Sequence, residues 1–303
     1  MRPALRPGLL ATWRDRDTVQ LGVDARRAVA VTGMSEKTAD VLRLLDGSRD
    51  RDQVIADAGR SGVPVAAAER VLTVLAAAGA LIDYPAQLLR SLPVELRRLL
   101  LPVLAVASLT SQDSDGGARL LELRTATTVA VTGRGPVAAA IADLLTRSGL
   151  TVRREQPGAR GRADLSVLVG QQQPELVAEL VRLGRPHLAV VATEAIGVVG
   201  PLVWPGSSAC LRCLDLARSE NDPAWPLLLA QVAGRDEDPA GCDPVLETAV
   251  AAQAAAMVVA VADRAPLAVA AVNGTLELVL PGWQWRRRSW RPHPDCTCGR
   301  RAA

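Results

Sequence analysis

Two pairs of cysteines, far apart in the sequence, constrain the fold more than any other feature. Cys210 and Cys213 form a Cys-x-x-Cys motif, and Cys296 and Cys298 form a Cys-x-Cys motif. The first spacing lets two thiolates converge in a turn, and residues i and i+2 of an extended segment point to the same side. Four such sulfurs suit a closed, tetrahedral Zn²⁺ site with no open position for a catalytic water. The motifs therefore predict a structural zinc site that ties the C-terminal tail to the turn at 210–213.

The same cysteines allow other interpretations. They could form disulfides or be unrelated core thiols, and His293 in "RPHP" could replace one sulfur as a ligand. A reducing compartment disfavours disulfides, and the occurrence of the cysteines in two close-spaced pairs disfavours unrelated thiols. Cys242 has no partner in the sequence and is expected to be a plain core or surface thiol.

Length and composition indicate a soluble protein of two domains. The chain has 303 residues, of which 49% are apolar, and its formal net charge of +3 is too small to indicate a nucleic-acid binder. The N-terminus lacks an apolar run long enough for a signal peptide. The most apolar stretch, 249–262, is shorter than the ~20 residues needed to cross a bilayer. We therefore expect a cytoplasmic protein with no membrane segment.

Residues 1–84 predict a small α+β module. Three short apolar-rich segments separated by charged turns predict an antiparallel sheet, and three helical segments follow, with a possible return strand at 80–83. The predicted strands are 8–14, 18–24 and 28–32, and the predicted helices are 35–47, 51–59 and 64–79. This is the order of a winged-helix module. Residues 85–124 are Leu-rich and interrupted by Pro85, Pro93 and Pro102, which predicts a connector with short helices.

Residues 125–303 alternate between strand and helix patterns, which predicts an α/β domain of Rossmann type with a parallel sheet. The predicted strands are 127–133, 150–155, 163–170 and 187–193, and the predicted helices are 136–149 and 174–184. A long buried helix is expected over 245–264. Within 267–280, Asn273-Gly274 predicts a two-residue hairpin turn.

A glycine-rich loop follows the first strand of this domain. In "VAVTGRGPVAAAIADLL", Gly133 and Gly135 form a G-x-G arrangement between strand and helix, and Glu155 lies where a ribose-binding acid is expected. Taken alone, the loop weakly favours a nucleotide site. The alternative is that it only makes the tight turn of the first strand–helix unit.

This domain resembles the ThiF/E1-like family of adenylating proteins in its glycine loop, its four cysteines and its terminal hairpin. In that family the fold implies ATP activating a carboxylate. Here the short "QPGARGR" omits the crossover that carries the family's catalytic Arg and Lys, and Gly170 stands where the family has a magnesium-binding Asp. Pro136 also removes a backbone N–H from the loop. The resemblance therefore implies a degenerate site in which Gly133 and Gly135 are vestigial, and ATP binding is not expected.

A closer resemblance is to the ThiF-like partner proteins of azole-forming (bacteriocin, TOMM) cyclodehydratases, through "PHLAVVATEAIGVVGPLVWPGSSACLRCLDLARSENDPAWP" and "HPDCTC". The first unit resembles the PqqD-like leader-peptide recognition element through "LLATWRDRDTVQLGVD" and "TADVLRLLDG". Together these imply a non-catalytic adaptor that binds the leader of a ribosomally made precursor peptide. It would present that peptide to a YcaO-type cyclodehydratase. E1-like domains often pair, so the resemblance also suggests a homodimer.

The expected peptide site is the free edge of the first sheet, because an extended peptide can add a strand there. By analogy the leader lies along Val29, Ala30 and Val31, facing the 64–79 helix near Arg70 and Thr73. One alternative is a DNA-binding winged helix, but that helix carries a single basic residue, so phosphate contacts would be few. The alternative for the whole chain is an ATP-dependent adenylyltransferase.

A basic segment near the C-terminus has no assigned role. Trp283, Trp285 and Arg286–Arg288 alternate as a strand would, with one face buried and one basic. The basic face could meet an acidic leader or partner, or it could simply be solvated.

Overall fold

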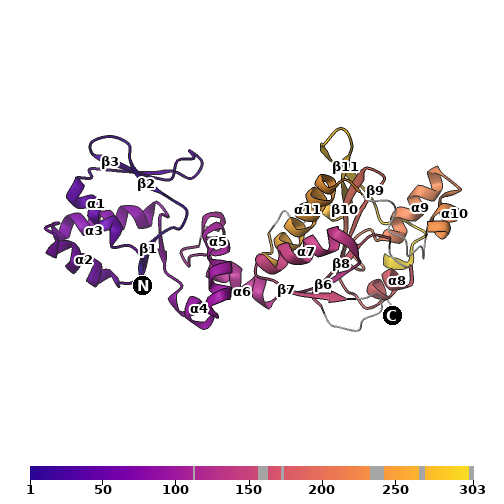
Figure 1. Ribbon diagram of the computed structural model, residues 1–303, viewed down its shortest axis with the longest axis horizontal. Coiled ribbons are helices and arrows are strands. Elements are labelled where there is room, and N and C mark those ends of the chain that lie inside the picture. Colours follow the sequence, from indigo (N-terminus) through magenta and orange to yellow (C-terminus); the bar gives the residue numbers. More distant parts are fainter. Residues whose placement is uncertain (112, 156–162, 172–173, 233–241, 266–269, 300–303) are drawn as a thin grey trace. The chain divides into compact units, whose positions relative to one another are not determined.

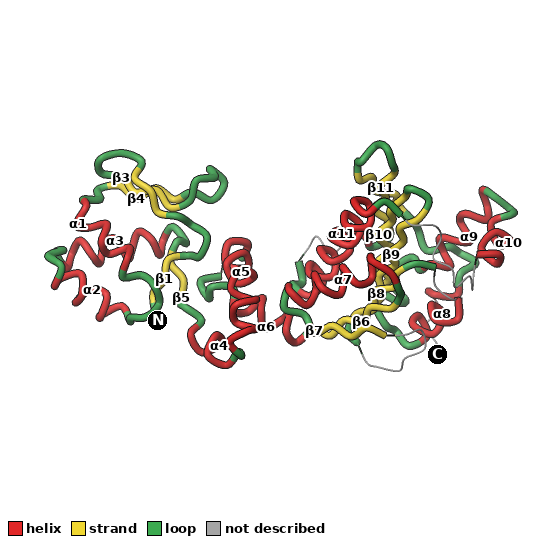
Figure 2. Tube along the Cα trace, viewed as in Figure 1, coloured by secondary structure: helices red, strands yellow, loops and turns green. Residues whose placement is uncertain are grey.

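The computed structural model describes residues 1–111, 113–155, 163–171, 174–232, 242–265 and 270–299 (Figures 1 and 2). The chain divides into two compact units, Met1–Glu122 and Leu123–Ala303. Each unit has its own hydrophobic core.

The first unit joins two small sheets to three helices. Its elements are β1 (Pro3–Leu5), β2 (Ala11–Trp13), β3 (Thr18–Leu21), β4 (Val29–Thr32), α1 (Glu36–Arg43), α2 (Arg51–Arg60), α3 (Val65–Ala77) and β5 (Leu81–Asp83). Strands β2, β3 and β4 form an antiparallel sheet in that order, and β1 pairs with β5. The predicted strands and helices of this region are therefore present, with shorter bounds.

Local signals set the helix ends in this unit. Asp50 caps α2 as predicted: its carboxylate accepts from the Gln53 N–H at 2.9 Å, and the Gln53 side chain accepts from the Asp50 N–H at 3.0 Å. Side chains from all three helices then close over one face of the β2–β3–β4 sheet. The fully buried members of this core include Leu21, Val41, Val54, Leu72 and Leu75.

The connector contains α4 (Ala86–Ser91), α5 (Val94–Thr110) and α6 (Ala118–Ala126). Pro85 and Pro93 stand at the N-caps of α4 and α5, but α5 continues through Pro102. The prediction that Pro102 interrupts this segment is therefore wrong. Pro102 is exposed, so the carbonyl that loses its helical partner can bond to water instead.

A buried arginine fastens the connector to the first strand pair. Arg6 is 8% exposed, and its guanidinium donates to the carbonyls of Gly79, Ser108, Ser111 and Asp113. Burial lowers the pKa of Arg6, and the carboxylate of Asp115 opposes that shift. The described residues up to Glu122 therefore belong with the first unit rather than forming a free linker.

The second unit contains a seven-stranded mixed sheet in the order β12-β11-β10-β9-β8-β6-β7. Strands β6 to β9 are parallel, and β9 to β12 are antiparallel. The strands are β6 (Thr128–Thr132), β7 (Thr151–Glu155), β8 (Leu165–Val169), β9 (His187–Thr193), β10 (Ile196–Val203), β11 (Gly274–Val279) and β12 (Trp285–Ser289). The sheet is the frame on which the candidate sites of this unit are built.

Helices cover both faces of this sheet (Figure 2). Side chains of α7 (Gly135–Arg147) and α11 (Pro244–Ala262) join the main core with alternate residues of the parallel strands. On the other face, α8 (Pro174–Arg182) packs on Leu168. The remaining helices, α9 (Leu211–Asn221) and α10 (Trp225–Val232), follow β10.

Two features of the second unit differ from the sequence prediction. Strand β10 was not predicted, and Asn273-Gly274 does not form a hairpin turn. Asn273 has a φ of 51° and leads into β11, while the hairpin joins β11 to β12 further along the chain. Residues 267–269 of the 267–280 segment lie outside the described residues.

Helix α11 is the one helix in the described ranges that is long and apolar enough to cross a membrane. Its Leu246, Val250 and Ala254 are fully buried against α7 and the sheet. Its composition is therefore explained by its place in the core, as the sequence predicted.

A nearly buried ion pair joins α6 to the C-cap of α11, and we expect its loss to destabilise the second unit. Arg124 donates to both carboxylate oxygens of Asp263 at 2.6–2.7 Å, and the two side chains are 11% and 15% exposed. Asp263→Asn should lower the free energy of unfolding by about 2 kcal/mol, because it leaves the guanidinium without a charged partner. Urea denaturation followed by tryptophan fluorescence measures this change. Asp143→Asn breaks the exposed pair with Arg147 and should cost under about 0.5 kcal/mol; equal costs would contradict the argument.

Candidate metal centre and peptide groove

The four paired cysteines meet in one cluster. The Sγ atoms of Cys210 and Cys213 are 3.8 Å apart, those of Cys210 and Cys296 are 3.6 Å apart, and those of Cys213 and Cys298 are 3.4 Å apart. All four sulfurs lie within 4.8 Å of one another. A tetrahedral zinc with Zn–S bonds of ~2.3 Å separates its sulfurs by about 3.8 Å. The donor set therefore fits one metal ion, and the separations are too long for disulfides of ~2.05 Å.

The cluster is positioned by the start of α9 and by the C-terminal tail. Cys210 is the N-cap of α9, and Cys213 lies in its first turn. The Ala209 N–H, just before Cys210, donates to the Asn273 side chain at 2.7 Å. This bond links the cysteine turn to the beginning of β11. Asn273 thus has a positive φ and contacts the cysteine turn without forming a hairpin.

The tail approaches through Trp290. This side chain is buried with the cysteines, and its Nε1 donates to Thr275 Oγ1 at 3.0 Å. Further on, the Cys296 N–H donates to the His293 carbonyl at 3.0 Å, which turns the tail toward α9. The His293 ring instead contacts Glu220, with 2.9 Å between Nε2 and Oε1. His293 therefore shapes the tail, and the sulfur cluster forms without it.

Burial makes this cluster a poor place for uncompensated thiolates. It raises the pKa of Cys210 to about 12 and also raises the pKa of Cys298. Burial acts in the same direction on Cys213, but hydrogen bonds from the backbone of His293 and Cys210, together with those from the neighbouring cysteine thiols, outweigh it and lower the pKa of Cys213. A bound cation would hold the sulfurs as thiolates, with release of their protons. Cys242 lies apart from the cluster, half-buried against the main core.

The glycine loop lies at the carboxyl end of β6, where the crossover connections diverge to β7 and β8. In doubly wound sheets this switch point is where ligands bind. A Cβ on Gly133 would come within 2.6 Å of the Val169 carbonyl of β8, so glycine is required there by close packing. Pro136 lies in the first turn of α7. The side chain of Glu155 and the "QPGARGR" crossover at 156–162 lie outside the described residues.

Strand β4 is an edge of the first sheet and borders a groove. The Arg14 N–H donates to the Thr18 carbonyl, so the backbone groups of Thr18 point toward β2. By alternation along β3, and from the register of β3 with β4, the backbone groups of Val31 point toward β3. The backbone groups of Ala30 and Thr32 therefore point away from the sheet. The adjoining groove has a volume of about 320 Å³ and lies between β4 and α3. Its lining residues are Ala30, Val31, Thr32, Gly33, Met34, Arg70, Val71 and Val74.

Three of the five residues assigned to peptide binding from the sequence thus line this groove. Arg70 reaches across it and donates to the Gly33 carbonyl at 3.2 Å. Thr73 is exposed, and its hydroxyl donates to the Glu69 carbonyl within α3. Val29 and Thr73 do not line the groove. Met34 and Val74 also line the groove but were not predicted from the sequence, although Met34 closely follows β4 and Val74 is one helical turn after Arg70.

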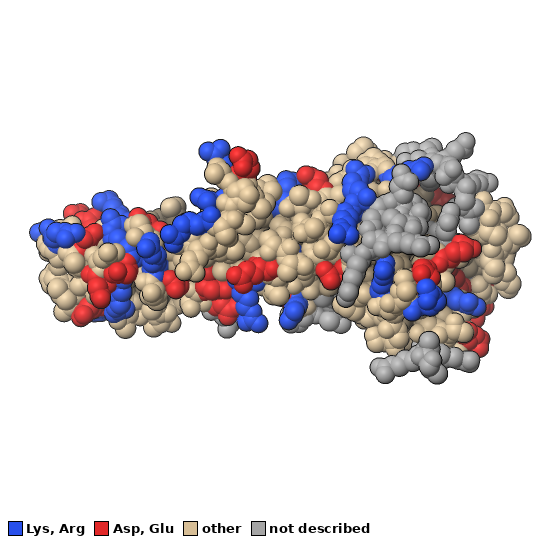
Figure 3. All heavy atoms as spheres, turned by 90° about the horizontal axis from the view of Figure 1, so that it is seen from below, with Lys and Arg blue, Asp and Glu red and all other residues tan. Residues whose placement is uncertain are grey.

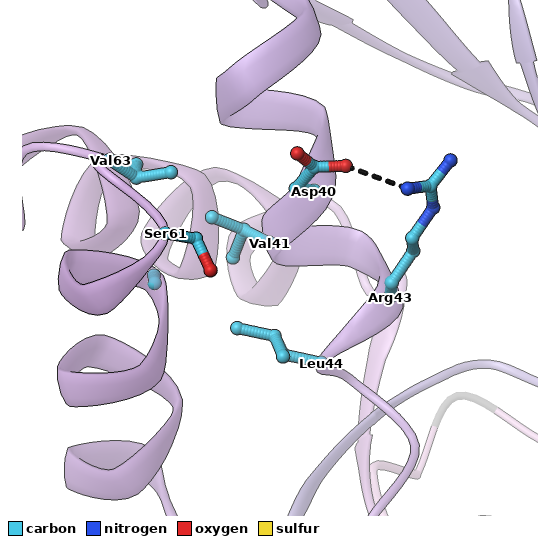
Figure 4. A pocket seen from close by; sticks show the side chains of 7 residues that line it. Asp40, Val41, Arg43, Leu44, Ser61 and Val63 are labelled. Carbon is cyan, nitrogen blue, oxygen red and sulfur yellow. Dashed lines mark hydrogen bonds and ion pairs between the residues drawn. The ribbon is translucent and has the colours of Figure 1, made fainter.

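A second hollow of about 280 Å³ lies on another side of this unit, between α1 and the end of α2 (Figure 4). Val41, Leu44 and Val63 give it an apolar floor, and the Asp40–Arg43 ion pair stands at its rim. It offers no free strand edge, so the groove beside β4 is the better candidate for an extended ligand.

No protein-family model matches the sequence, and neither does any curated protein. Solved structures do match the fold over nearly the whole chain. The heterocyclase TruD is 21% identical with a TM-score of 0.66, and the match covers 98% of this chain and 43% of that protein. The microcin C7 biosynthetic enzyme MccB, in complex with N-formylated MccA, is 15% identical with a TM-score of 0.57 and covers 99% and 100%. MccB of E. coli with ATP is 14% identical with a TM-score of 0.58 and covers 98% and 99%.

These likenesses concern the fold. The chain spans less than half of the heterocyclase but the full length of MccB. The seven-stranded mixed sheet with its surrounding helices matches the E1/ThiF-like fold that the glycine loop, the cysteines and the hairpin predicted.

Proposed function

We propose that the chain is a non-catalytic adaptor that binds the leader of a ribosomally made precursor peptide. It would present that peptide to a YcaO-type cyclodehydratase, which forms azolines, azoles or related backbone modifications. The observation that carries the proposal is the open edge of β4 beside a groove, on a fold shared with a heterocyclase and with a peptide-bound biosynthetic enzyme. The first unit would act as a winged-helix module of the PqqD-like type.

The chemistry of the groove supports an extended peptide as its ligand. Ala30 and Thr32 direct backbone donors and acceptors outward, which favours an added strand. Val31, Val71 and Val74 supply an apolar wall for a leader side chain, and Arg70 places a positive charge at its edge. Backbone pairing would supply affinity, and the groove would select the side chain.

Nucleic acid is a poorer ligand for this module. Basic and acidic side chains are interspersed over the face shown in Figure 3. Arg70 on α3 stands next to Glu69, so the helix offers few phosphate contacts. The peptide edge remains the stronger candidate.

The difference in length between this chain and TruD supports a separate catalytic partner. The match covers 43% of that heterocyclase, so most of it has no counterpart in this chain. In our proposal a YcaO-type enzyme supplies the cyclising chemistry. Reduced cysteines fit a cytoplasmic location. A homodimer, as is frequent among E1-like domains, is included in the proposal.

A second candidate function is ATP-dependent adenylyl transfer, because one fold neighbour is MccB with ATP. The loop at Gly133 and Gly135 stands at the switch point where a nucleotide would lie. Against this, Pro136 removes an N–H from the first turn of the helix, and Gly170 stands at the end of β8 where a carboxylate would be needed for magnesium. We therefore favour the adaptor.

We further propose that the sulfur cluster holds a structural Zn²⁺, bound by Cys210, Cys213, Cys296 and Cys298. Four thiolate ligands close the coordination sphere. When bound, the ion would neutralise the buried thiolates and tie the tail to α9. The protein contributes the fixed positions of the sulfurs, through Asn273 and Trp290.

Leader binding is tested by a backbone change at the strand edge. Ala30→Pro removes an N–H that faces away from β3, so the sheet should persist while an added strand loses a hydrogen bond and meets the proline ring. With labelled leader peptides encoded beside this gene, fluorescence anisotropy should show binding at least about tenfold weaker. Arg43→Ala, at the second hollow, is the matched control and should leave the affinity unchanged. Equal affinity of the proline variant and the parent protein would refute strand addition at β4.

Calorimetry with ATP and Mg²⁺ separates the two candidate functions. The adaptor proposal expects no heat beyond that of a buffer titration, because the loop lacks donors and a magnesium ligand. Saturable heat with a stoichiometry near one would favour the adenylyltransferase instead.

Removal of one sulfur tests the zinc proposal. Cys298→Ser should release the metal and lower the melting temperature, because three thiolates and an alcohol bind zinc less tightly. Leader binding by the first unit should remain. Elemental analysis measures the zinc content, with Cys242→Ser as a control that should keep the ion. Unchanged zinc in the Cys298 variant would count against the assignment.

A further inference from the structure

The last strand of the seven-stranded sheet has an unpaired side. Strand β12 pairs only with β11. Just beyond its end, the Trp290 N–H donates to the Asn273 carbonyl at 2.9 Å. By the alternation of antiparallel strands, every second residue of β12, beginning with Trp285, directs its backbone groups away from β11. Within the described ranges, no backbone hydrogen bond reaches this outer side.

Three consecutive arginines follow this edge. Arg286, Arg287 and Arg288 are exposed, and alternation places the first and third on one face of the sheet. Arg287, on the other face, is already engaged: its guanidinium donates to the carbonyls of Ala270 and Val272 at 2.9 and 3.2 Å. It therefore fastens the strand from behind and is not free for a partner.

The other two guanidiniums have no ion pair in the described part of the chain. Arg288 lies 4.3 Å from the centroid of the Trp290 ring, which holds it in place beside the edge. Glu277 faces Arg286 across the strand pair, but its carboxylate accepts from the Thr275 hydroxyl at 2.8 Å. This face of the sheet therefore presents the guanidiniums of Arg286 and Arg288, two residues apart along β12, next to unpaired backbone donors and acceptors.

Charge disfavours one occupant of this edge, and the lack of matching backbone groups disfavours another. A second copy of β12 would bring arginines opposite arginines, which destabilises a cross-strand pair. A nucleic acid would meet the arginines but lacks the alternating N–H and C=O groups that the strand edge matches. An extended polypeptide with carboxylates at alternate positions satisfies both the backbone and the charges.

We propose that the β12 edge binds an extended acidic segment of a partner protein as an eighth strand of the sheet. Aspartates or glutamates two residues apart in that segment would lie on one face, opposite Arg286 and Arg288. The outward backbone groups of β12 would supply the ladder. This surface lies on the second unit and does not depend on leader binding at β4.

The test uses the full chain and a short, capped, fluorescein-labelled peptide in which glutamate alternates with valine. Arg286→Glu combined with Arg288→Glu should weaken binding roughly tenfold or more at low salt, and added salt should weaken binding to the parent protein. A peptide with lysine in place of glutamate should bind the charge-reversed variant but not the parent. Equal binding of the glutamate peptide to parent and variant would overturn the proposal.

The backbone contribution is tested at Ser289, whose N–H points outward. Ser289→Pro should weaken peptide binding about fivefold, whereas Ser289→Ala keeps the N–H and should bind as the parent does. Thermal melting monitors folding of every variant, and the leader assay with the first unit should be unaffected. An unchanged affinity of a folded proline variant, or displacement of the peptide by a single-stranded oligonucleotide, would also overturn the proposal.

Discussion

The convergence of four cysteine sulfurs, three of them on buried residues, governs the C-terminal part of the second unit. Cys210 and Cys213 begin α9, while Cys296 and Cys298 end the tail that follows β12. Without a cation, burial opposes their ionisation, and among the described residues the tail would depend on Trp290, on the contact of His293 with Glu220 and on a few backbone bonds. A bound metal would offset this effect of burial, because its positive charge neutralises the buried thiolates.

Local rules predicted much of the fold because they act within a few residues. The capping box at Asp50 and the alternation of strands and helices after residue 125 both appear in the structure. Strand β10 escaped prediction because Gly197, Gly200 and Pro201 read as interruptions. In the folded chain a Cβ on Gly197 would come within 2.3 Å of Val250, so the glycine lets α11 pack on the strand. The need for that glycine is a tertiary contact that no local pattern contains.

In the candidate sites, too, local sequence patterns predicted some features, while others depend on tertiary contacts. Cysteine spacing identified the four residues that meet in the sulfur cluster, because paired cysteines are the usual donors of a metal site. Asn273, which orients the cysteine turn, carried a hairpin signal instead, because asparagine before glycine favours positive φ whatever its purpose. The same limit applied at the groove: Arg70 was visible as a lone charge on α3, but its bond to the Gly33 carbonyl depends on how α3 meets β4.

The two open edges, β4 and β12, differ in what protects them from unwanted pairing. An unpaired strand attracts any extended chain, and proteins commonly guard such edges with charge. At β12 that guard would be Arg286 and Arg288, which in our proposal disfavour a second copy of the strand and favour a carboxylate-bearing one. At β4 the strand itself carries no charged side chain, and selection would come from the groove beside it, through its shape and the single charge of Arg70. A charged edge is sensitive to salt, whereas a groove is sensitive to side-chain volume. If both proposals hold, the two edges would recognise their ligands by different chemistry.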